Sequence, residues 1–547
     1  MECLIRELMR DPLLLKYSVV MVDEAHERSI HTDIIVGLLK KILKRRADLR
    51  VIVSSATLDA EAVRDFFNQD DSKGKSEEIA TIITIEGRAF PVDVFYISSP
   101  VPDYVKATME TILKIHKHEK PGDILAFLTG QEEVEHVCAL VREAAESMQR
   151  VTMQLLVLPM YASLTAKEQL KVFQRTPEKT RKVVIATNIA EASITINGIT
   201  YVIDCGFVKL RAFNPDTGSD CLVVVPVSQA SAEQRSGRAG RVRSGKSYRL
   251  YPEEEHAKLP AATVPEMQRS DLSTVLLLLK ALGVSNVLRF NFLSKPPAQN
   301  MSRALDLLYA LGAIDVDGKL TEQLGQQMAE FPLEPMFAKM LLESGKFECS
   351  EEILSIAAML NIECVFTTPS IGKAKADRAK YQFSVEEGDH LTLLNVYESF
   401  IKKKKSARWC HENYLNYKGL MRVVDVRNQL KGLLQRFEIP LVSAEGDADR
   451  ICRCIAAGFF ANAARLHYTG EYRTVKDDLP IHVHPSSVLY ALKPAQWVMF
   501  NEVLLTSRAY MRNVTAIDPR WLYELAPHYY QYGTEREIAA KRMKTGT

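Results

Sequence analysis

The sequence has nine cysteines but no CxxC pair, and no apolar run long enough to cross a bilayer. Cysteines scattered in this way favour buried or free thiols in a reducing compartment over a metal clamp or a disulfide framework. The apolar stretch STVLLLLKALGV is too short to span a membrane, and the N-terminus MECLIRELMRDP mixes charges into its apolar residues, unlike a signal peptide. We therefore expect a soluble, intracellular protein without a membrane anchor.

The sequence also lacks an excess of charge of either sign. Its formal net charge is +2 at pH 7, so composition alone gives no reason to expect a polyanionic partner. Any surface that binds nucleic acid must therefore be local. The 547 residues are enough for several domains, each with its own core.

A phosphate-loop pattern is present, but its usual context is missing. GRVRSGKS, residues 240–247, matches G-x-x-x-x-G-K-[ST]. Such a loop follows a buried strand and opens a helix, so that backbone N–H groups surround the phosphates. Here the preceding SAEQRSGRAG is polar and rich in arginine, and the following SYRLY alternates like a strand. We therefore interpret the match as accidental.

Short apolar runs alternate with amphipathic stretches through the first half of the chain. Helical patterns such as TDIIVGLLKKILKRR and QEEVEHVCALVREA separate the apolar runs. This alternation predicts parallel sheets that are covered by helices on both faces. The predicted buried strands are residues 17–22, 50–53, 124–128, 154–161, 182–186 and 201–204.

After about Glu253 the pattern becomes mostly helical. MSRALDLLYALGAIDVDGKLTE predicts a helix followed by a hairpin that turns at Asp317-Gly318, which suggests a winged helix. In the last hundred residues, IHVHP, VLYAL and WVMFNEVLLT predict short strands.

Polar residues follow the ends of several predicted strands. They are Asp23-Glu24-Ala25-His26, Ser54-Ser55-Ala56-Thr57, Thr129-Gly130 and Thr187-Asn188. Open α/β sheets bind ligands at the carboxyl ends of their strands. One carboxylate there can organise Mg²⁺ through water while its neighbour orients or deprotonates an attacking water. A lone Asp-Glu pair is more often a helix cap, but the SSAT sequence one strand later favours the catalytic interpretation.

The segment QRSGRAGR, residues 234–241, concentrates positive charge. Arg235, Arg238 and Arg241 recur every three residues, so on a helix they would share roughly one face. Like charges so placed need anions opposite them, and guanidinium groups bind phosphate oxygens bidentately. The alternative is a basic face neutralised by local carboxylates, of which Glu233 is the only one nearby in the sequence. We favour phosphate binding.

Five motifs, in order, carry a resemblance to a known family: DEAHERS, SATLDAE, FLTGQEEVE, ATNIAEASITINGI and QRSGRAGR. They are similar to motifs II to VI of the DEAH-box RNA helicases, and the nearest likeness is to the spliceosome-associated branch. PEMQRSDL, GDHLTLLNVY, ARWCHENYLN and MRNVTAIDPRWL resemble later modules of the same family.

The resemblance implies an α/β fold with two RecA-like parallel-sheet domains, the first incomplete, followed by winged-helix, helical ratchet-like and OB-fold modules. The implied bounds are 1–90 for the incomplete first RecA-like domain, which holds the DEAH and SAT motifs, and 91–253 for the second, which holds motifs IV to VI. They are 254–325 for the winged helix, 326–440 for the ratchet-like domain, 441–535 for the OB-fold and 536–547 for a tail.

The resemblance also implies a site for ATP, or another nucleoside triphosphate, with Mg²⁺. Asp23 and Glu24 would be the Mg²⁺ residues, with Asp23 placing the ion and Glu24 acting also as the water-activating base. His26 and Gln234 would bridge the two RecA-like domains around the γ-phosphate. Arg238 and Arg241 would be arginine fingers, and Phe173 would stack on the base.

Further residues are implied to couple hydrolysis to RNA. Ser55 and Thr57 would link hydrolysis to domain movement, while Thr129, Gly130 and Thr195 would contact the RNA backbone. The segment 207–226 would form the hairpin that separates strands. Asn197 departs from the family pattern, which commonly has Asp there, and its role stays open.

The larger departure concerns the phosphate loop. In the family this loop lies well upstream of DEAH, whereas 22 residues precede Asp23 here, and LIRE at 4–7 looks like the tail of motif Ib. We therefore expect residues 1–547 to lack the phosphate loop and motif Ia, and to hydrolyse ATP no faster than background alone. We also expect the first domain, without the strand beside residues 50–53, to fold poorly on its own.

The resemblance thus implies an RNA helicase that moves on single-stranded RNA through NTP-driven closure of two domains, in pre-mRNA splicing or RNP remodelling in the nucleus. Its expected partners are RNA, mainly the single-stranded backbone, together with spliceosomal proteins and an activating protein. The alternative is a non-catalytic RNA-binding or assembly module. A nucleotidase that uses residues 240–247 is a third interpretation.

A lysine run and three nearby aromatic residues each allow a structural or an RNA-binding interpretation. Lys402 to Lys405 is interpreted as a solvated helix face rather than an RNA contact. Trp409, Tyr414 and Tyr417 are interpreted as core aromatics, with stacking on RNA bases left open.

Overall fold

The computed structural model describes residues 2–56, 60–69, 79–85, 87, 90–147, 153–164, 166–191, 195–362, 365–367, 373–505 and 508–530. The chain begins with a two-stranded parallel sheet of β1 (Val19–Val22) and β2 (Arg50–Val53), accompanied by three helices. These helices are α1 (Glu2–Arg10), α2 (Ile30–Leu43) and α3 (Ala60–Asn68). Both predicted strands are present, and β2 has the predicted bounds.

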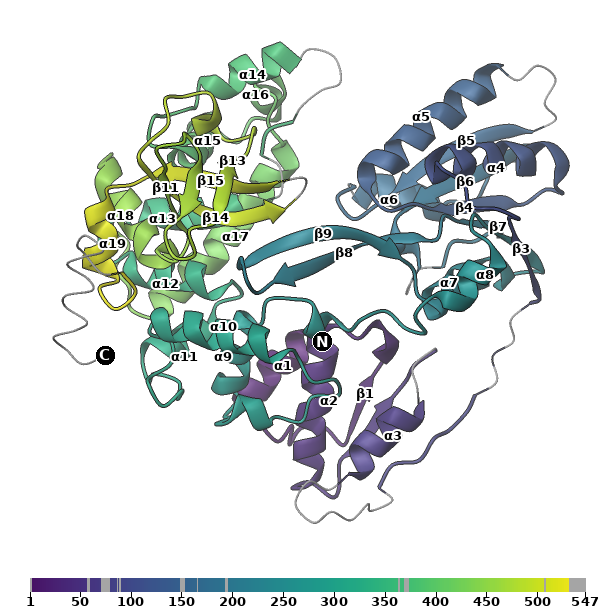
Figure 1. The fold of residues 1–547 in the computed structure, drawn as a ribbon, viewed down its shortest axis with the longest axis horizontal. Helices are drawn as coiled ribbons and strands as arrows, with labels where there is room; N and C mark the ends of the chain where they lie inside the picture. The colour runs from purple at the N-terminus through teal and green to yellow at the C-terminus, as the bar shows by residue number, and fades with distance from the viewer. Residues whose placement is uncertain are drawn as a thin grey trace.

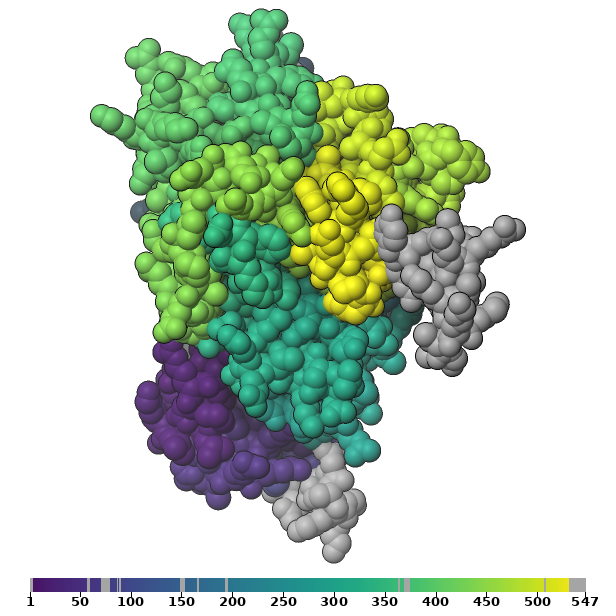
Figure 2. All heavy atoms as spheres, turned by 90° about the vertical axis from the view of Figure 1, so that its left-hand side faces the viewer, coloured from purple at the N-terminus to yellow at the C-terminus, as the bar shows by residue number. Residues whose placement is uncertain are grey.

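This first module packs on the predicted winged-helix region, residues 254–325 (Figures 1 and 2). Ile5, Leu8 and Ile34 are buried in one cluster with Met267 and Leu276. A Cβ atom on Gly37 of α2 would lie 2.6 Å from the backbone oxygen of Asn291, so the two segments are in close contact.

One face of the strand at residues 50–53 is therefore covered, while its outer edge has no partner strand among the described residues. Val51 and Val53 pack against the shared core, whereas Ile52 is 49% exposed, as are Val19 at 52% and Met21 at 59%. The expectation of poor folding considered the first domain alone; in the structure the winged-helix region supplies part of its core.

The second RecA-like module contains a six-stranded parallel sheet in the order β3-β10-β7-β4-β6-β5. Its central strands β4, β6 and β7 are almost wholly buried, and alternate residues of β4 contribute to two different clusters, as expected for a sheet with helices on both faces. The strands are β3 (Val92–Tyr96), β4 (Asp123–Phe127), β5 (Gln154–Met160), β6 (Thr180–Ala186), β7 (Ile199–Asp204) and β10 (Gly245–Arg249). The helices are α4 (Tyr104–His118), α5 (Gln131–Ser147), α6 (Ala166–Phe173) and α7 (Gln229–Gly237).

The segment GRVRSGKS has no phosphate-loop geometry. Its last residues lie on β10, which pairs in parallel with β3 and β7. The Lys246 Nζ atom is 2.8 Å from a Glu119 carboxylate oxygen, and the buried Ser247 hydroxyl shares a 2.9 Å hydrogen bond with Ser236. The match is therefore accidental, as predicted.

The predicted strand-separating segment is an antiparallel hairpin of β8 (Phe207–Asn214) and β9 (Ser219–Pro226). It reaches from the second RecA-like module to the C-terminal modules (Figure 1). There β9 pairs with β14 (Trp497–Leu505), so the hairpin joins a seven-stranded sheet, β11-β12-β13-β15-β14-β9-β8.

The winged-helix region holds the tip of this hairpin. Arg303 donates to the backbone oxygens of Pro215 and Asp216, the latter at 3.1 Å. Gln299 donates to the Asp216 carboxylate at 2.5 Å. Gly218 has φ +65°, which favours glycine, and a Cβ atom added there would lie only 2.1 Å from the Arg303 guanidinium. The tip therefore needs glycine both for its backbone turn and for its close contact with Arg303.

The remaining chain is helical and then β-rich. An antiparallel bridge joins Ile314 and Leu320 around Gly318, which has φ +70°, so the predicted helix and hairpin are present. The helices are α8 (Glu253–Lys258), α9 (Ser273–Ala281), α10 (Ala298–Ala310), α11 (Leu324–Glu330), α12 (Pro335–Glu343), α13 (Ser350–Leu360), α14 (Lys373–Tyr381), α15 (Asp389–Lys402), α16 (Ala407–Glu412), α17 (Tyr417–Arg436), α18 (Ala448–Phe459) and α19 (Pro519–Leu525). The additional strands are β11 (Ala463–Leu466), β12 (Tyr472–Thr474), β13 (Pro480–Val483) and β15 (Ala509–Ala516).

The strand predicted for VLYAL is wrong. Val488–Tyr490 forms a 3-10 turn instead, and the Ser487 hydroxyl caps it by accepting a 3.2 Å hydrogen bond from the Leu489 amide. Within the described ranges no helix is long and apolar enough to cross a membrane, and no group of three or more metal-binding side chains occurs.

Candidate active site

The turn after β1 carries the DEAH residues in a constrained backbone. Glu24 and Arg28 both have left-handed conformations, with φ +53° and +48°. Each such residue costs about 1–3 kcal/mol and persists only where its surroundings fix it. Arg28 is fixed by bidentate hydrogen bonds of 2.9 and 2.8 Å to Asp33.

The winged-helix region braces the same turn. The Glu266 amide donates to the Arg28 carbonyl oxygen at 3.1 Å, and the Glu266 carboxylate accepts from the Ile30 amide at 3.0 Å. The Arg28 guanidinium also donates to the Ser294 hydroxyl at 2.8 Å. The DEAH turn is therefore held between the first module and residues more than two hundred positions away.

Hydrogen bonds favour the ionised form of the Asp23 carboxyl group. The Ser54 hydroxyl and the Glu24 amide donate to its carboxylate and, with the nearby His26, lower its pKa below the usual value. The carboxylate lies at the exposed carboxyl end of β1, where an acidic oxygen can meet a cation or its bound water.

His26 links the DEAH turn to the SAT segment. Its Nδ1 atom accepts from the Ala56 amide at 3.4 Å, which places the proton of the neutral ring on Nε2. Nε2 lies 3.4 Å from a Glu24 carboxylate oxygen. His26 can thus orient Glu24 while sensing the position of the SAT segment, in which Ser55 is exposed and Thr57 lies outside the described residues.

The three arginines of QRSGRAGR do not share a face. Arg235 is fully buried and pairs with Asp204 at 2.7 Å and Glu191 at 2.9 Å. Burial alone would lower the pKa of Arg235, but these carboxylates raise it above its usual value. The expectation that Arg235 faces an anionic ligand is wrong, because α7 ends at Gly237 and Arg235 points into the core.

Arg238 and Arg241 are placed differently. Arg238 is half-buried and donates to the Glu191 carbonyl oxygen. Burial lowers the pKa of Arg238 to about 10, as does Arg241, while the charges of Glu191 and Glu24 oppose this shift. The arginine therefore stays charged at neutral pH, and it lies within electrostatic range of the DEAH glutamate.

Gln234 and the residues predicted to contact RNA lie in the second module. Arg241 is exposed and donates to the hydroxyl of the exposed Thr195, while Gln234 is half-buried. The Thr129 hydroxyl is buried and donates to Glu133 at 2.8 Å, so it has an internal partner. Gly130 faces the side chain of Lys209 on the hairpin, at 3.9 Å from its hypothetical Cβ.

Two predicted positions lie at the periphery. Phe173 ends α6 with 37% of its surface exposed, as a stacking residue would need. The exposed Asn197 accepts from the Lys182 ammonium through its backbone oxygen at 3.5 Å, so no role of its side chain is visible.

Sequence reasoning missed Glu191, Asp204 and Lys209. Glu191 lies inside the motif ATNIAEASITINGI and Asp204 ends a predicted strand, so the strand-end rule could have found Asp204. The position of Lys209 beside Gly130 depends on how the hairpin folds back.

Comparison with known proteins gives four family matches along the chain. They are the helicase conserved C-terminal domain at residues 106–243, the winged-helix and ratchet-like parts of the helicase associated domain at 304–333 and 334–393, and the oligonucleotide/oligosaccharide-binding (OB)-fold at 451–529.

Similar proteins extend the match to nearly the whole chain. The human "Probable ATP-dependent RNA helicase DHX35" is 62% identical over 99% of this chain and 77% of its own length. The relative of the same name in Pongo abelii is 63% identical over 97% of this chain and 74% of its own length. The Caenorhabditis elegans homologue is 53% identical over 99% of this chain and 74% of its own length. The chain belongs to the DEAH-box RNA helicases.

The activity of this family is ATP-dependent RNA unwinding, so the enzyme class is a helicase and nucleoside-triphosphate hydrolase. The described residues fit part of a nucleotide site. Asp23 is exposed and ionised beside Glu24, and two charged arginines lie on the facing module. Mg²⁺ is commonly bound by one or two carboxylates together with substrate phosphates, and arginines suit phosphate oxygens.

Proposed function

We propose that this DEAH-box helicase acts in pre-mRNA splicing or RNP remodelling in the nucleus, moving on single-stranded RNA. The proposal that ATP drives this movement is supported by an electrostatic interaction between the two RecA-like modules. The charge of Glu24, on the first module, is among those that shift the pKa of Arg238, on the second. A site divided between two modules is completed only when they approach, which couples ligand binding to domain movement.

Each side chain then has a task suited to its place. Glu24 is the base that takes a proton from water, and His26 orients it through Nε2. Arg238 and Arg241 bind the terminal phosphate oxygens, with Gln234 beside them. Asp23 would hold Mg²⁺, which supplies positive charge against the phosphates. Phe173 would stack on the base.

The coupling residues follow from the same arrangement. Ser55 and Thr57 continue from Ser54, whose hydroxyl bonds Asp23, so a movement of this segment reaches the carboxylate directly. Thr129, Gly130 and Thr195 would meet the RNA backbone. The support for Thr195 is its exposure, and for Gly130 its place beside Lys209, whose ammonium suits a phosphate.

We further propose that the polypeptide of residues 1–547, tested by itself, binds RNA but hydrolyses ATP at background. Its only G-x-x-x-x-G-K-[ST] match ends on strand β10, where Lys246 is paired with Glu119. The assay compares RNA-stimulated ATP turnover and RNA affinity of the purified chain. Turnover above background would overturn the proposed inactivity, and absence of nucleotide binding with intact RNA binding supports a non-catalytic role for this polypeptide alone.

The arginine roles are tested with Arg238→Ala and Arg241→Ala. RNA affinity of residues 1–547 should stay almost unchanged. In the same chain extended upstream with a phosphate loop of the family, turnover should fall about 10³-fold or more, the scale on which arginine fingers act. Lys246→Ala is the matched control, because it removes a positive charge on β10 and should leave turnover intact.

Protein partners are part of the proposal. An activating protein and spliceosomal proteins would bind this helicase, and co-purification from nuclear and cytoplasmic fractions tests their presence. Recovery with splicing proteins only from the nuclear fraction is the expected result; recovery with cytoplasmic RNPs alone would contradict the proposed location.

A further inference from the structure

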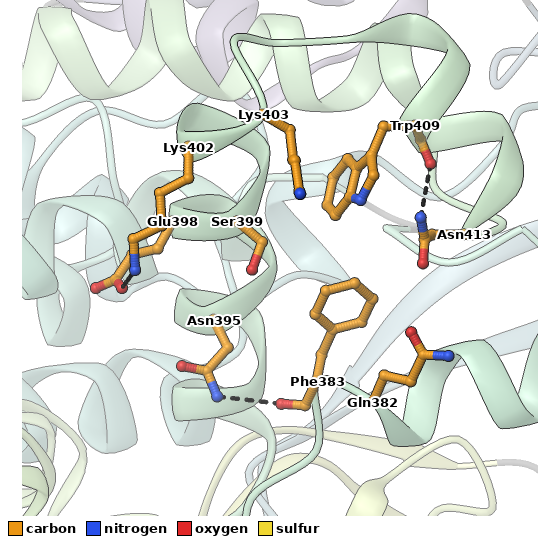
Figure 3. Close-up of a pocket in the computed structure, with 9 residues that line it drawn as sticks. All are labelled: Gln382, Phe383, Asn395, Glu398, Ser399, Lys402, Lys403, Trp409 and Asn413. Carbon is orange, nitrogen blue, oxygen red and sulfur yellow. Dashed lines mark hydrogen bonds and ion pairs between the residues drawn. The ribbon is translucent and has the colours of Figure 1, made fainter.

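A pocket on the ratchet-like module lies outside the residues that the helicase motifs assign. It opens between the end of α14, the last turns of α15 and helix α16, with a volume of about 350 Å³. Sites for small ligands usually measure about 300–1,000 Å³, so this pocket suits one small ligand. Figure 3 shows its lining residues: Gln382, Phe383, Asn395, Glu398, Ser399, Lys402, Lys403, Trp409 and Asn413.

Three hydrogen-bond donors point into the same space. Figure 3 shows the Lys403 ammonium, the Trp409 indole nitrogen and the Ser399 hydroxyl around its centre. Ser399 and Lys403 are one helical turn apart, and the Lys403 amide donates to the Ser399 carbonyl at 2.9 Å. Lysine and tryptophan can only donate, and a hydroxyl can donate as well. Such a set suits an oxyanion.

The charge of the pocket favours the same ligand. Lys402 lies 3.4 Å from the Glu398 carboxylate on the next turn of α15, so these two charges offset each other. Within the described part of the chain, no ion pair involves Lys403. Its positive charge is therefore the one that a ligand in the pocket would meet.

Two aromatic rings form an apolar wall beside the donors. The Phe383 and Trp409 rings contact edge to face, with centroids 5.9 Å apart and an angle of 85°. Asn395 donates to the Phe383 carbonyl at 3.2 Å, and Asn413 donates to the Trp409 carbonyl at 2.9 Å. Because both backbones are tied down, the rings are held in place before a ligand arrives.

We propose that this pocket binds one nucleotide of single-stranded RNA, with its phosphate on Lys403, Ser399 and the Trp409 N–H, and its base against Phe383. The inference rests on the proposed RNA binding and adds a base-contacting site to the backbone contacts. A planar base explains the aromatic wall, which the carboxylate of an acidic peptide would leave unused.

Tryptophan fluorescence gives a direct readout, since the chain has three tryptophans, and Trp497 and Trp521 lie on other elements. The probes are uridine 5′-monophosphate and an oligouridylate, titrated into residues 1–547. Both should quench the emission saturably, and Trp409→Phe should remove the quenching. Inorganic phosphate should compete weakly with the mononucleotide, because it lacks the base.

The matched pair is Lys403→Gln and Lys404→Gln. Both residues are exposed and in the same lysine run, but only Lys403 lines the pocket. Lys403→Gln should weaken mononucleotide binding about tenfold, since a hydrogen bond to a charged group contributes on that scale. Lys404→Gln should leave it unchanged.

The outcomes separate this pocket from RNA binding as a whole. Normal oligouridylate affinity with no quenching, or equal losses in both lysine variants, would overturn the pocket alone. No oligouridylate binding at all would overturn the proposed RNA binding as well. Quenching by an acidic peptide but not by the nucleotide would assign the pocket to a protein ligand and contradict the inference.

Discussion

Replacing Arg235 with leucine should destabilise the second RecA-like module severely, although the residue lies in the same motif as Arg238 and Arg241, which we propose to bind the nucleotide. The Arg235 side chain is fully buried, with Asp204 at 2.7 Å and Glu191 at 2.9 Å. Its guanidinium also lies 4.9 Å from the Phe127 ring centroid. Leucine would leave two carboxylates without their cation, and Asp204 is completely buried.

The magnitude follows from the burial of the pair. Breaking a buried ion pair by removing one partner costs about 3–5 kcal/mol, because the remaining charge is not compensated. For a domain of 150–250 residues this corresponds to a fall in Tm of roughly 10 °C, at about 2–4 °C per kcal/mol. Scanning calorimetry of the intact chain is the assay, since a multidomain chain needs its transitions resolved.

Two further variants sharpen the assay. Arg241→Ala is the control, because Arg241 is exposed and should cost at most about 0.5 kcal/mol. Adding Asp204→Asn to Arg235→Leu should recover part of the loss, since the buried site then carries one charge fewer. A transition of Arg235→Leu within about 1 °C of the unsubstituted chain would refute the assignment of Arg235 as a structural cation.

Three other outcomes are expected. Gly218→Ala should lower the free energy of unfolding by about 1–2 kcal/mol and expose the hairpin tip to protease, because its φ is +65° and the new Cβ would lie 2.1 Å from the Arg303 guanidinium. The control for backbone strain alone is Gly283→Ala, because Gly283 has φ +80° and no atom within 4 Å of the new Cβ. Burial lowers the pKa of His390, which bonds Thr515 and Asn501 at 2.7 Å, against the opposing effects of Asn501 and Asp389. The unfolded chain therefore binds more protons than the folded chain as the pH falls below about 6.5, so the urea midpoint should decrease when the pH is lowered from about 7.5 to 5.5. His390→Gln should reduce this pH dependence, and an unchanged dependence in that variant would contradict the assignment. Lys246→Ala should lower the free energy of unfolding by less than about 1 kcal/mol in thermal melts, because its ion pair with Glu119 is partly exposed. In the chain extended upstream with a phosphate loop of the family it should leave nucleotide binding unchanged, and a loss of that binding would restore the phosphate-loop interpretation of residues 240–247.

Periodicity predicted the buried strands well because burial on both faces leaves apolar runs such as ILAF in β4, VVIA in β6 and YVI in β7. The predicted bounds differ from the observed ones by one or two residues, and β6 begins earlier than predicted because Thr180 and the buried Arg181 lack the apolar signal. The edge strand β3 was missed because VDVFY is largely exposed and carries a weaker signal. VLYAL has strand-like residues, but the Ser487 hydroxyl stabilises a local turn instead.

Contacts between distant segments could not be predicted in the same way. β9 pairs with β14 through Asp220–Leu504 and Cys221–Leu505, and Arg303 clamps the hairpin tip. Each segment alone is compatible with several partners, and the choice depends on register and burial across the fold. The sequence predicted the hairpin but not the sheet that it joins, which links the second RecA-like module to the OB-fold region.

The arginines of QRSGRAGR show why a charge pattern is ambiguous. The sequence offered Glu233 as the nearby carboxylate, whereas the partners of Arg235 are 31 and 44 positions away. Because α7 ends at Gly237, Arg235 enters the core, whereas Arg238 is half-buried and Arg241 is exposed. Loss of activity would follow substitution of any of them, so turnover alone cannot assign their roles. The melting temperature can distinguish the roles, because the stability of the second module depends on the charge of the buried Arg235 and not on that of the other two arginines.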